Sequence, residues 1–188
     1  MTPIARATLR RAEPEDADLV HAWRGEPSAT RYQPLRPLTV DQVRAQLLQR
    51  RQAPLDATLD GEVQWLILDA GVPAGWVTLQ VVSREHGIAA VGYTVAEAHR
   101  GRGLATDALR RVAYMGLDPN HFDLWRLEAI AATANVASRR VLEKAGFAQE
   151  GHARGLLVIG GVRVDHERYA LLRTELDAEH SRPTGVRP

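Results

Sequence analysis

The sequence contains no cysteine. This absence excludes disulfide bonds, thiol catalysis and zinc sites that need thiolate ligands. It fits a reducing compartment such as the cytosol. The seven histidines are scattered, and no two of them stand four residues apart, as a pair of ligands on one face of a helix would. We therefore predict a protein without a metal site.

The chain also lacks a strong charge of either sign and any long hydrophobic run. Its 24 Lys and Arg residues are balanced by 23 Asp and Glu residues, which leaves a net charge of +1. Such a balance gives no reason to expect nucleic acid or a membrane surface as a partner. The first thirty residues show no apolar run typical of a signal peptide, and no later stretch approaches a membrane span. We predict a cytoplasmic protein.

The most informative stretch that is present joins an apolar run at residues 88–95 to an amphipathic pattern at residues 104–115. The run predicts a strand and the pattern a helix. The connection at residues 100–103 reads Arg-Gly-Arg-Gly. Glycines let a ligand approach the backbone, and the free amides at a helix N-terminus bind anions, to which Arg100 and Arg102 add charge. The turn predicts a phosphate site, although an ordinary turn with solvated arginines remains an alternative, because neither a P-loop nor a complete dinucleotide motif is present.

The rest of the chain alternates short strand patterns with helix patterns. We predict strands at residues 5–12, 62–69, 73–82, 88–95, 123–132, 147–153, 156–159 and 162–172, and helices at 14–25, 40–52, 104–116 and 136–145. Residues 27–37 are interpreted as a connection interrupted by prolines. This order predicts a mixed sheet flanked by helices. A single domain is expected over residues 1–176, followed by a polar, disordered tail at 177–188.

Three motifs, in order along the chain, resemble the GCN5-related N-acetyltransferases. The turn Arg-x-x-Gly-x-Ala at residues 100–105 is similar to the Gln/Arg-x-x-Gly-x-Gly/Ala turn of that family. The segment Asn-x-x-Ser…Glu-Lys-Ala-Gly-Phe at residues 135–147 is similar to a second family segment. The strand pattern at 162–172 resembles the branch that acetylates the N-termini of ribosomal proteins. The resemblance covers about residues 5–175.

The resemblance implies an α+β fold of three layers. Its mixed, mostly antiparallel sheet of about seven strands would be splayed in the middle to hold acetyl-CoA, the cosubstrate. The backbone of Tyr93, Thr94 and Val95 would pair with the pantetheine arm, as an added strand would. Asn135 would also hydrogen-bond the arm, and Ser138 would lie near the sulfur. The pyrophosphate would contact a turn formed by Arg100, Gly101, Arg102, Gly103, Leu104, Ala105 and Thr106.

Acetyl transfer needs a neutral amine and benefits from a proton on the leaving thiolate. An α-amine has a pKa of about 7.7–8.0 and a lysine one of about 10.4, so only the lysine needs a strong base. Ser138 is the predicted proton donor, with a helix-capping role as the alternative. Glu128 is the candidate base, with an ion pair to Arg126 as the alternative. Tyr93 is a further candidate, for orienting a water molecule.

These arguments predict an N-acetyltransferase that acts on the N-terminal α-amine of a ribosomal or other protein. Two alternatives remain open: an enzyme for a small amine (a polyamine, an antibiotic or an amino-acid derivative), and a non-catalytic CoA-binding sensor. A homodimer is one assembly that we consider. We expect the acceptor pocket in the loops at residues 27–37 and 83–87, with Trp23 and Tyr32 as candidate lining residues. All four tryptophans are expected in the core.

Overall fold

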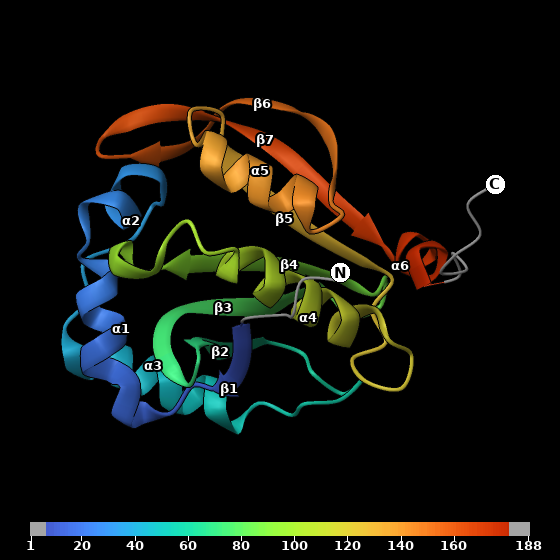
Figure 1. Ribbon diagram of the computed structural model, residues 1–188, viewed down its shortest axis with the longest axis horizontal. Helices are drawn as coiled ribbons and strands as arrows, with labels where there is room; N and C mark the ends of the chain where they lie inside the picture. Colours follow the sequence, from blue (N-terminus) through green and yellow to red (C-terminus); the bar gives the residue numbers. More distant parts are fainter. Residues whose placement is uncertain (1–6, 181–188) are drawn as a thin grey trace.

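The computed structural model describes residues 7–180 and builds them into one seven-stranded sheet with helices on both faces (Figure 1). The strands are β1 (Ala7–Arg11), β2 (Glu62–Asp69), β3 (Val72–Ser83), β4 (Ile88–Val95), β5 (Arg126–Ala132), β6 (Ala148–Ile159) and β7 (Val162–Leu172). The helices are α1 (Ala17–Arg24), α2 (Pro27–Tyr32), α3 (Val40–Gln52), α4 (Leu104–Leu117), α5 (Val136–Lys144) and α6 (Arg173–His180). The strand order is β1-β2-β3-β4-β5-β7-β6.

The sheet opens in its middle, between β4 and β5. These two strands are parallel, whereas all other neighbouring strands are antiparallel. They pair over three positions only, from Ile88 opposite Arg126 to Ala90 opposite Glu128. Beyond that point β4 stays paired with β3, and β5 stays paired with β7. The expected mixed, mostly antiparallel and splayed sheet is confirmed, and its two free strand edges face one gap.

Each face of the sheet has its own core. On one face α4 and α5 bury Leu109, Val112 and Leu142 against the strands. On the other face α1 and α3 pack on β2 and β3, where Trp23 stacks on Trp76 with ring centroids 6.2 Å apart. Burying one such large apolar side chain contributes about 1.5–3 kcal/mol. The two cores hold the helices in place around the gap.

Two helices were not predicted. Residues 27–37 begin with α2, because Pro27 occupies the first helical turn, where the missing N–H is not needed. The chain also continues after β7 into α6, which crosses the expected domain boundary at residue 176. The remainder of the expected tail, residues 181–188, lies outside the described residues, as do the first two residues of the expected strand at 5–12.

Two further expectations were wrong in detail. The strands predicted at 147–153 and 156–159 form the single strand β6, whose pairing with β7 shifts register around Gly155, a glycine with φ of +57°. Trp125 is 48% exposed rather than buried. It precedes β5 at the surface, and the Arg173 guanidinium lies 5.7 Å from its ring centroid. A surface cation over an indole ring explains how the side chain is accommodated outside the core.

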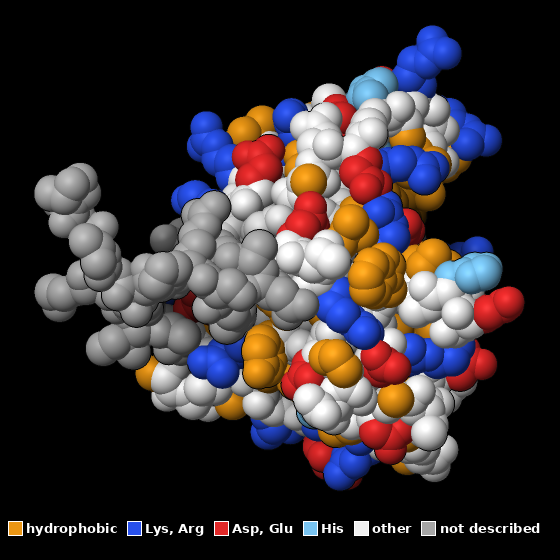
Figure 2. Space-filling view, turned by 90° about the vertical axis from the view of Figure 1, so that its right-hand side faces the viewer, with side chains coloured by type: hydrophobic (Ala, Val, Ile, Leu, Met, Phe, Trp, Pro, Cys, Tyr) orange, Lys and Arg blue, Asp and Glu red, His pale blue; other side chains and the backbone are white. Residues whose placement is uncertain are grey.

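The surface carries charges of both signs. Seen from the α6 side, the described Lys, Arg, Asp and Glu side chains are interspersed (Figure 2), in keeping with the net charge of +1. None of the helices in the described range is long and apolar enough to cross a membrane.

Candidate active site

The turn before α4 forms a cradle made of backbone. Gly103 precedes the helix with φ of +82° and gives it no side-chain cap. The first N–H groups of a helix have no partner within it and can bind an anion. A Cβ atom added at Gly101 or Gly103 would meet nothing within 4 Å, so a ligand can approach the backbone closely. This arrangement fits the pyrophosphate of acetyl-CoA.

The two arginines of this turn already have protein partners. Arg102 forms an ion pair with Asp69 at 2.7 Å, and it lowers the pKa of that carboxyl together with His99. Arg100 donates from Nε to the Val95 carbonyl at 2.9 Å and forms an ion pair with Glu26 at 3.6 Å. Much of their charge is therefore compensated, and the attraction for phosphate depends mainly on the α4 amides.

The edge of β4 offers backbone groups to the gap. Ala96 donates its N–H to the Ala74 carbonyl of the β3 side at 2.9 Å. Because alternate residues of an antiparallel pair exchange hydrogen bonds, Thr94 also directs its backbone toward β3, whereas Tyr93 and Val95 direct theirs toward β5. An extended ligand in the gap would thus pair with Tyr93 and Val95.

At the N-terminus of α5, two predicted residues lie beside the gap. The Asn135 side chain caps this helix by accepting from the Ser138 N–H at 3.1 Å. The Ser138 hydroxyl is therefore not the cap. Its Oγ lies 2.7 Å from the Tyr93 hydroxyl, which also donates to the Ser138 carbonyl at 3.1 Å. Burial raises the pKa of Tyr93 to about 12, so its hydroxyl keeps its proton at neutral pH.

Glu128 lies elsewhere. It belongs to the closed, paired part of β5, and its carboxylate accepts from Arg126 Nε at 2.8 Å. Arg126 also binds Glu150, and the two carboxylates together raise its pKa. This geometry corresponds to the alternative in which Glu128 is an ion-pair partner.

In the described part of the chain, no group of three His, Asp or Glu side chains is arranged to hold a metal ion.

A cavity of about 230 Å³ lies on the α1 and α3 face of the sheet and reaches Gly92 and Tyr93. Its lining includes Gln33 and Leu35 from the connection after α2, which belong to the segment 27–37 expected to line the acceptor pocket. The loop at 83–87, Trp23 and Tyr32 are not among its lining residues; Trp76 is. The polar side chains in its lining are those of Arg24, Gln33, Gln46, Arg50, Glu62, Gln64 and Thr78.

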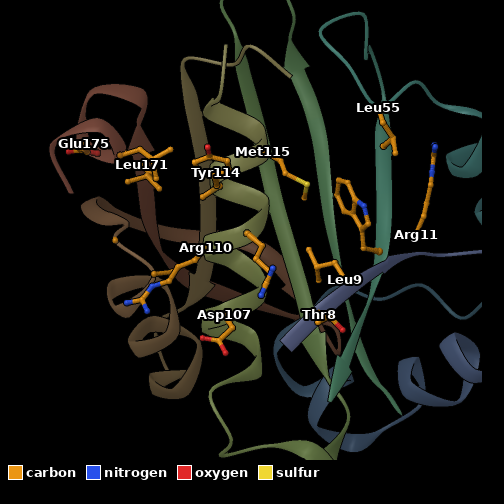
Figure 3. A pocket seen from close by; sticks show the side chains of 16 residues that line it. Thr8, Leu9, Arg11, Leu55, Asp107, Arg110, Tyr114, Met115, Leu171 and Glu175 are labelled. Atoms are coloured by element: carbon orange, nitrogen blue, oxygen red, sulfur yellow. The ribbon is translucent and has the colours of Figure 1, made fainter. Parts of the chain in front are cut away.

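A larger cavity of about 1060 Å³ is located beside α4, on the other face of the sheet (Figure 3). Leu9 and Trp65 line it from β1 and β2, and Tyr114 and Met115 line it from α4. None of its lining residues belongs to the predicted site. The predicted site lies instead at the free strand edges and the helix N-termini.

Three comparisons bear on this geometry. The acetyltransferase (GNAT) domain family model matches residues 6–148. "Uncharacterized N-acetyltransferase p20" of Bacillus licheniformis is 28% identical over 174 residues, 90% of this chain and 94% of that protein. "Putative ribosomal N-acetyltransferase YdaF" of Bacillus subtilis is 32% identical over 123 residues, 65% of this chain and 66% of that one. The solved structure of spermidine N-acetyltransferase from Vibrio cholerae with CoA and spermine has a TM-score of 0.79 at 21% identity, covering 92% of this chain and 99% of that one.

Proposed function

The chain belongs to the GNAT acetyltransferase domain family and is an N-acetyltransferase that uses acetyl-CoA, and from this we propose that its acceptor is the N-terminal α-amine of a protein. A ribosomal protein is the favoured class, supported by the likeness to YdaF. The observation that carries the proposal is the Tyr93–Ser138 hydroxyl pair beside the gap, together with the engagement of Glu128 by Arg126. Such a site supplies a proton donor and suits an amine that is already neutral near pH 8.

Acetyl-CoA supplies the acetyl group as a thioester when bound. The α4 amides and the turn of Gly101 and Gly103 would hold its pyrophosphate, as the open space above both glycines allows. Tyr93 and Val95 would hold its arm through their backbone groups, and Asn135 would donate to it from its amide nitrogen.

Ser138 gives its proton to the departing thiolate, and its oxygen recovers through solvent the proton that the acceptor nitrogen loses when the amide forms. Tyr93 supports this step when its single hydroxyl proton is donated to Ser138 Oγ rather than to the Ser138 carbonyl, because the serine proton is then free to point at the sulfur. The acceptor loses its own proton to solvent, which an α-amine does readily near its pKa of about 7.7–8.0. The same geometry would serve a lysine poorly, since its pKa is about 10.4.

A polyamine acceptor is the second candidate. It is favoured by the fold shared with the spermidine N-acetyltransferase that holds CoA and spermine. A polyamine also carries primary amines of high pKa, so it would require a stronger base than an α-amine does.

A thioester-cleavage assay separates the candidates. We would compare peptides with free N-termini, the same peptides with a blocked N-terminus and an internal lysine, and spermidine. We expect the free N-termini to react fastest, with a rate that rises through an apparent pKa near 8 and then levels off. Reaction of spermidine or blocked lysine peptides alone, still accelerating above pH 9, would contradict the proposal.

A further inference from the structure

We propose that the cavity on the α1 and α3 face is the acceptor pocket and that it selects amines carrying a carboxylate. The inference rests on the proposed function, because it names the class of acceptor for the same site. Gly92 and Tyr93 of β4 line this cavity, and the Tyr93 backbone faces the gap. An amine bound beside Tyr93 would therefore approach the acetyl group, while the rest of the acceptor would extend toward α1 and α3.

Arg24 supplies the positive charge of the pocket. Its half-buried guanidinium donates to the Arg36 carbonyl at 3.1 Å, and it forms no ion pair with the described residues. Burial and the neighbouring charge of Arg50 lower its pKa, while Glu62, which is paired with Arg50, raises it and only partly offsets the decrease. A ligand carboxylate would supply the missing counter-ion and form a charge-assisted hydrogen bond.

Two neighbouring side chains point to the same chemistry. Arg50 is already paired with Glu62 through Nε at 2.8 Å and also donates to the Gln64 side-chain oxygen. The Gln64 amide nitrogen is then left buried without an acceptor among the described residues, in a side chain only 2% exposed. An unpaired buried donor is costly, and an oxygen atom of the acceptor would satisfy it.

The charge and size of the pocket disfavour a polyamine. Two arginines and one glutamate give the lining a net charge of +1, which repels a second ammonium group. The cavity of about 230 Å³ is smaller than the roughly 300–1,000 Å³ of pockets for drug-sized ligands, so it matches a small acceptor or a single side chain. Its charge then favours an acidic acceptor over a cationic one.

The test compares acceptors that differ only in charge. Peptides with Glu, Gln or Lys at the first or second position, free glutamate, and spermidine would be assayed with acetyl-CoA. We expect kcat/KM for the Glu peptides to exceed that for their Gln counterparts by roughly 10- to 100-fold, mainly through KM, as a hydrogen bond to a charged group predicts. Comparing free glutamate with the Glu peptides shows whether the acceptor is a small amino acid or an acidic protein N-terminus.

Arg24→Gln should reduce the Glu-to-Gln ratio to about one, and Arg24→Lys should retain most of it. Arg44→Gln is the matched control: it removes the same charge from α3, outside the cavity lining, and should leave the ratio unchanged. Titration of the Glu peptide into the CoA complex would report the same loss in Kd, and melting curves would verify that the variants fold.

The remaining outcomes would contradict either the carboxylate inference alone or the proposed function with it. If α-amines react without preference for acidic peptides, or if Arg24→Gln keeps the ratio, the carboxylate inference is wrong while the proposed function stands. If spermidine is the best acceptor or no α-amine reacts, both the proposed function and this inference are wrong.

Discussion

At the scale of single residues, the contact between Tyr93 and Ser138 joins β4 to α5 beside the gap. Its two hydroxyl oxygens lie 2.7 Å apart, and the raised pKa of Tyr93 keeps that side chain protonated. Asn135, not Ser138, caps the helix with its side chain. The two roles that the sequence left open for Ser138 are thereby separated, because a hydroxyl free of capping is available for proton transfer.

We expect Ser138→Ala to lower kcat by about 100-fold, the lower end of what general acid catalysis contributes, because a thiolate is already a tolerable leaving group. The Kd of acetyl-CoA should change little, since its contacts lie on other residues. The melting temperature should also change little, whereas Asn135→Ala should cost about 1 kcal/mol of stability through the lost cap. Saturation kinetics and melting curves on both variants check this. An unchanged kcat for Ser138→Ala would remove the serine from the mechanism.

Single residues also show how much of the candidate site could be predicted from the sequence. The Asn135 cap and the neighbouring Ser138 were predictable, because a cap is a local pattern of a few residues. The Tyr93–Ser138 contact was not, since 45 positions separate the two residues along the chain and only the fold brings them together. Arg24 gave no signal for the same reason: an arginine in an amphipathic helix pattern reads as a solvated side chain until the cavity around it is known.

At the scale of elements, substitutions of two glycines test whether the turn that starts α4 binds CoA. Gly103→Ala should weaken CoA binding, because the added Cβ projects into the open space of the cradle. It should also cost roughly 1–2 kcal/mol of stability, since an alanine disfavours φ of +82°.

Gly161→Ala in the β6–β7 turn is the control, with φ of +81° and equally open space. It should lose similar stability and keep its affinity for CoA. Melting curves and CoA titrations measure both quantities. Equal Kd values in the two variants would show that the α4 turn does not hold the pyrophosphate.

The β6–β7 pair provides a pH-dependent prediction. His152 of β6 hydrogen-bonds Glu167 of β7 at 2.9 Å, and this contact raises the pKa of the histidine. The protonated imidazole therefore stabilises the folded protein. Its contribution is complete below the ordinary histidine pKa of about 6.5 and disappears as the pH rises through the raised value. The difference in melting temperature between the wild type and His152→Gln should shrink as the pH rises from 5.5 to 9. A constant difference would contradict this assignment.

The helices and strands also show which sequence patterns predicted the structure correctly and which did not. The spans predicted for α3, β2, β4 and β7 agree with the structure, because each has clear ends in the sequence, such as the Thr39 and Gln42 capping box at the start of α3. The helix α2 was missed because Pro27 suggests a break, although proline is compatible with a first helical turn. The union of two predicted strands into β6 depended on β7, whose pairing carries β6 across Gly155.

At the scale of the whole molecule, CoA should stabilise the fold by binding only the folded state. At a concentration of 100 times Kd this amounts to about 2.7 kcal/mol, which corresponds to roughly 5–11 °C in melting temperature for a chain of this size. A thermal-shift titration measures it, with ATP as the control ligand that shares the adenosine and phosphates but lacks the pantetheine arm. If free CoA gives no shift at saturation, the cradle and gap are not its binding site.

The splay between β4 and β5 has a consequence for the way the chain folds. Residues 7–95 supply β1 to β4, which are consecutive antiparallel neighbours, and residues 126–172 supply the other three strands, in which β7 lies between β5 and β6. Each half of the sheet is therefore one continuous stretch of the chain, and the parallel contact between the halves needs the α4 crossover. Because the halves pair over three positions only, and β5 is synthesised after β4, we expect the β4–β5 pairs to form after β1 to β4 have paired. The N-terminal half can then pair its strands during synthesis, before the second half leaves the ribosome.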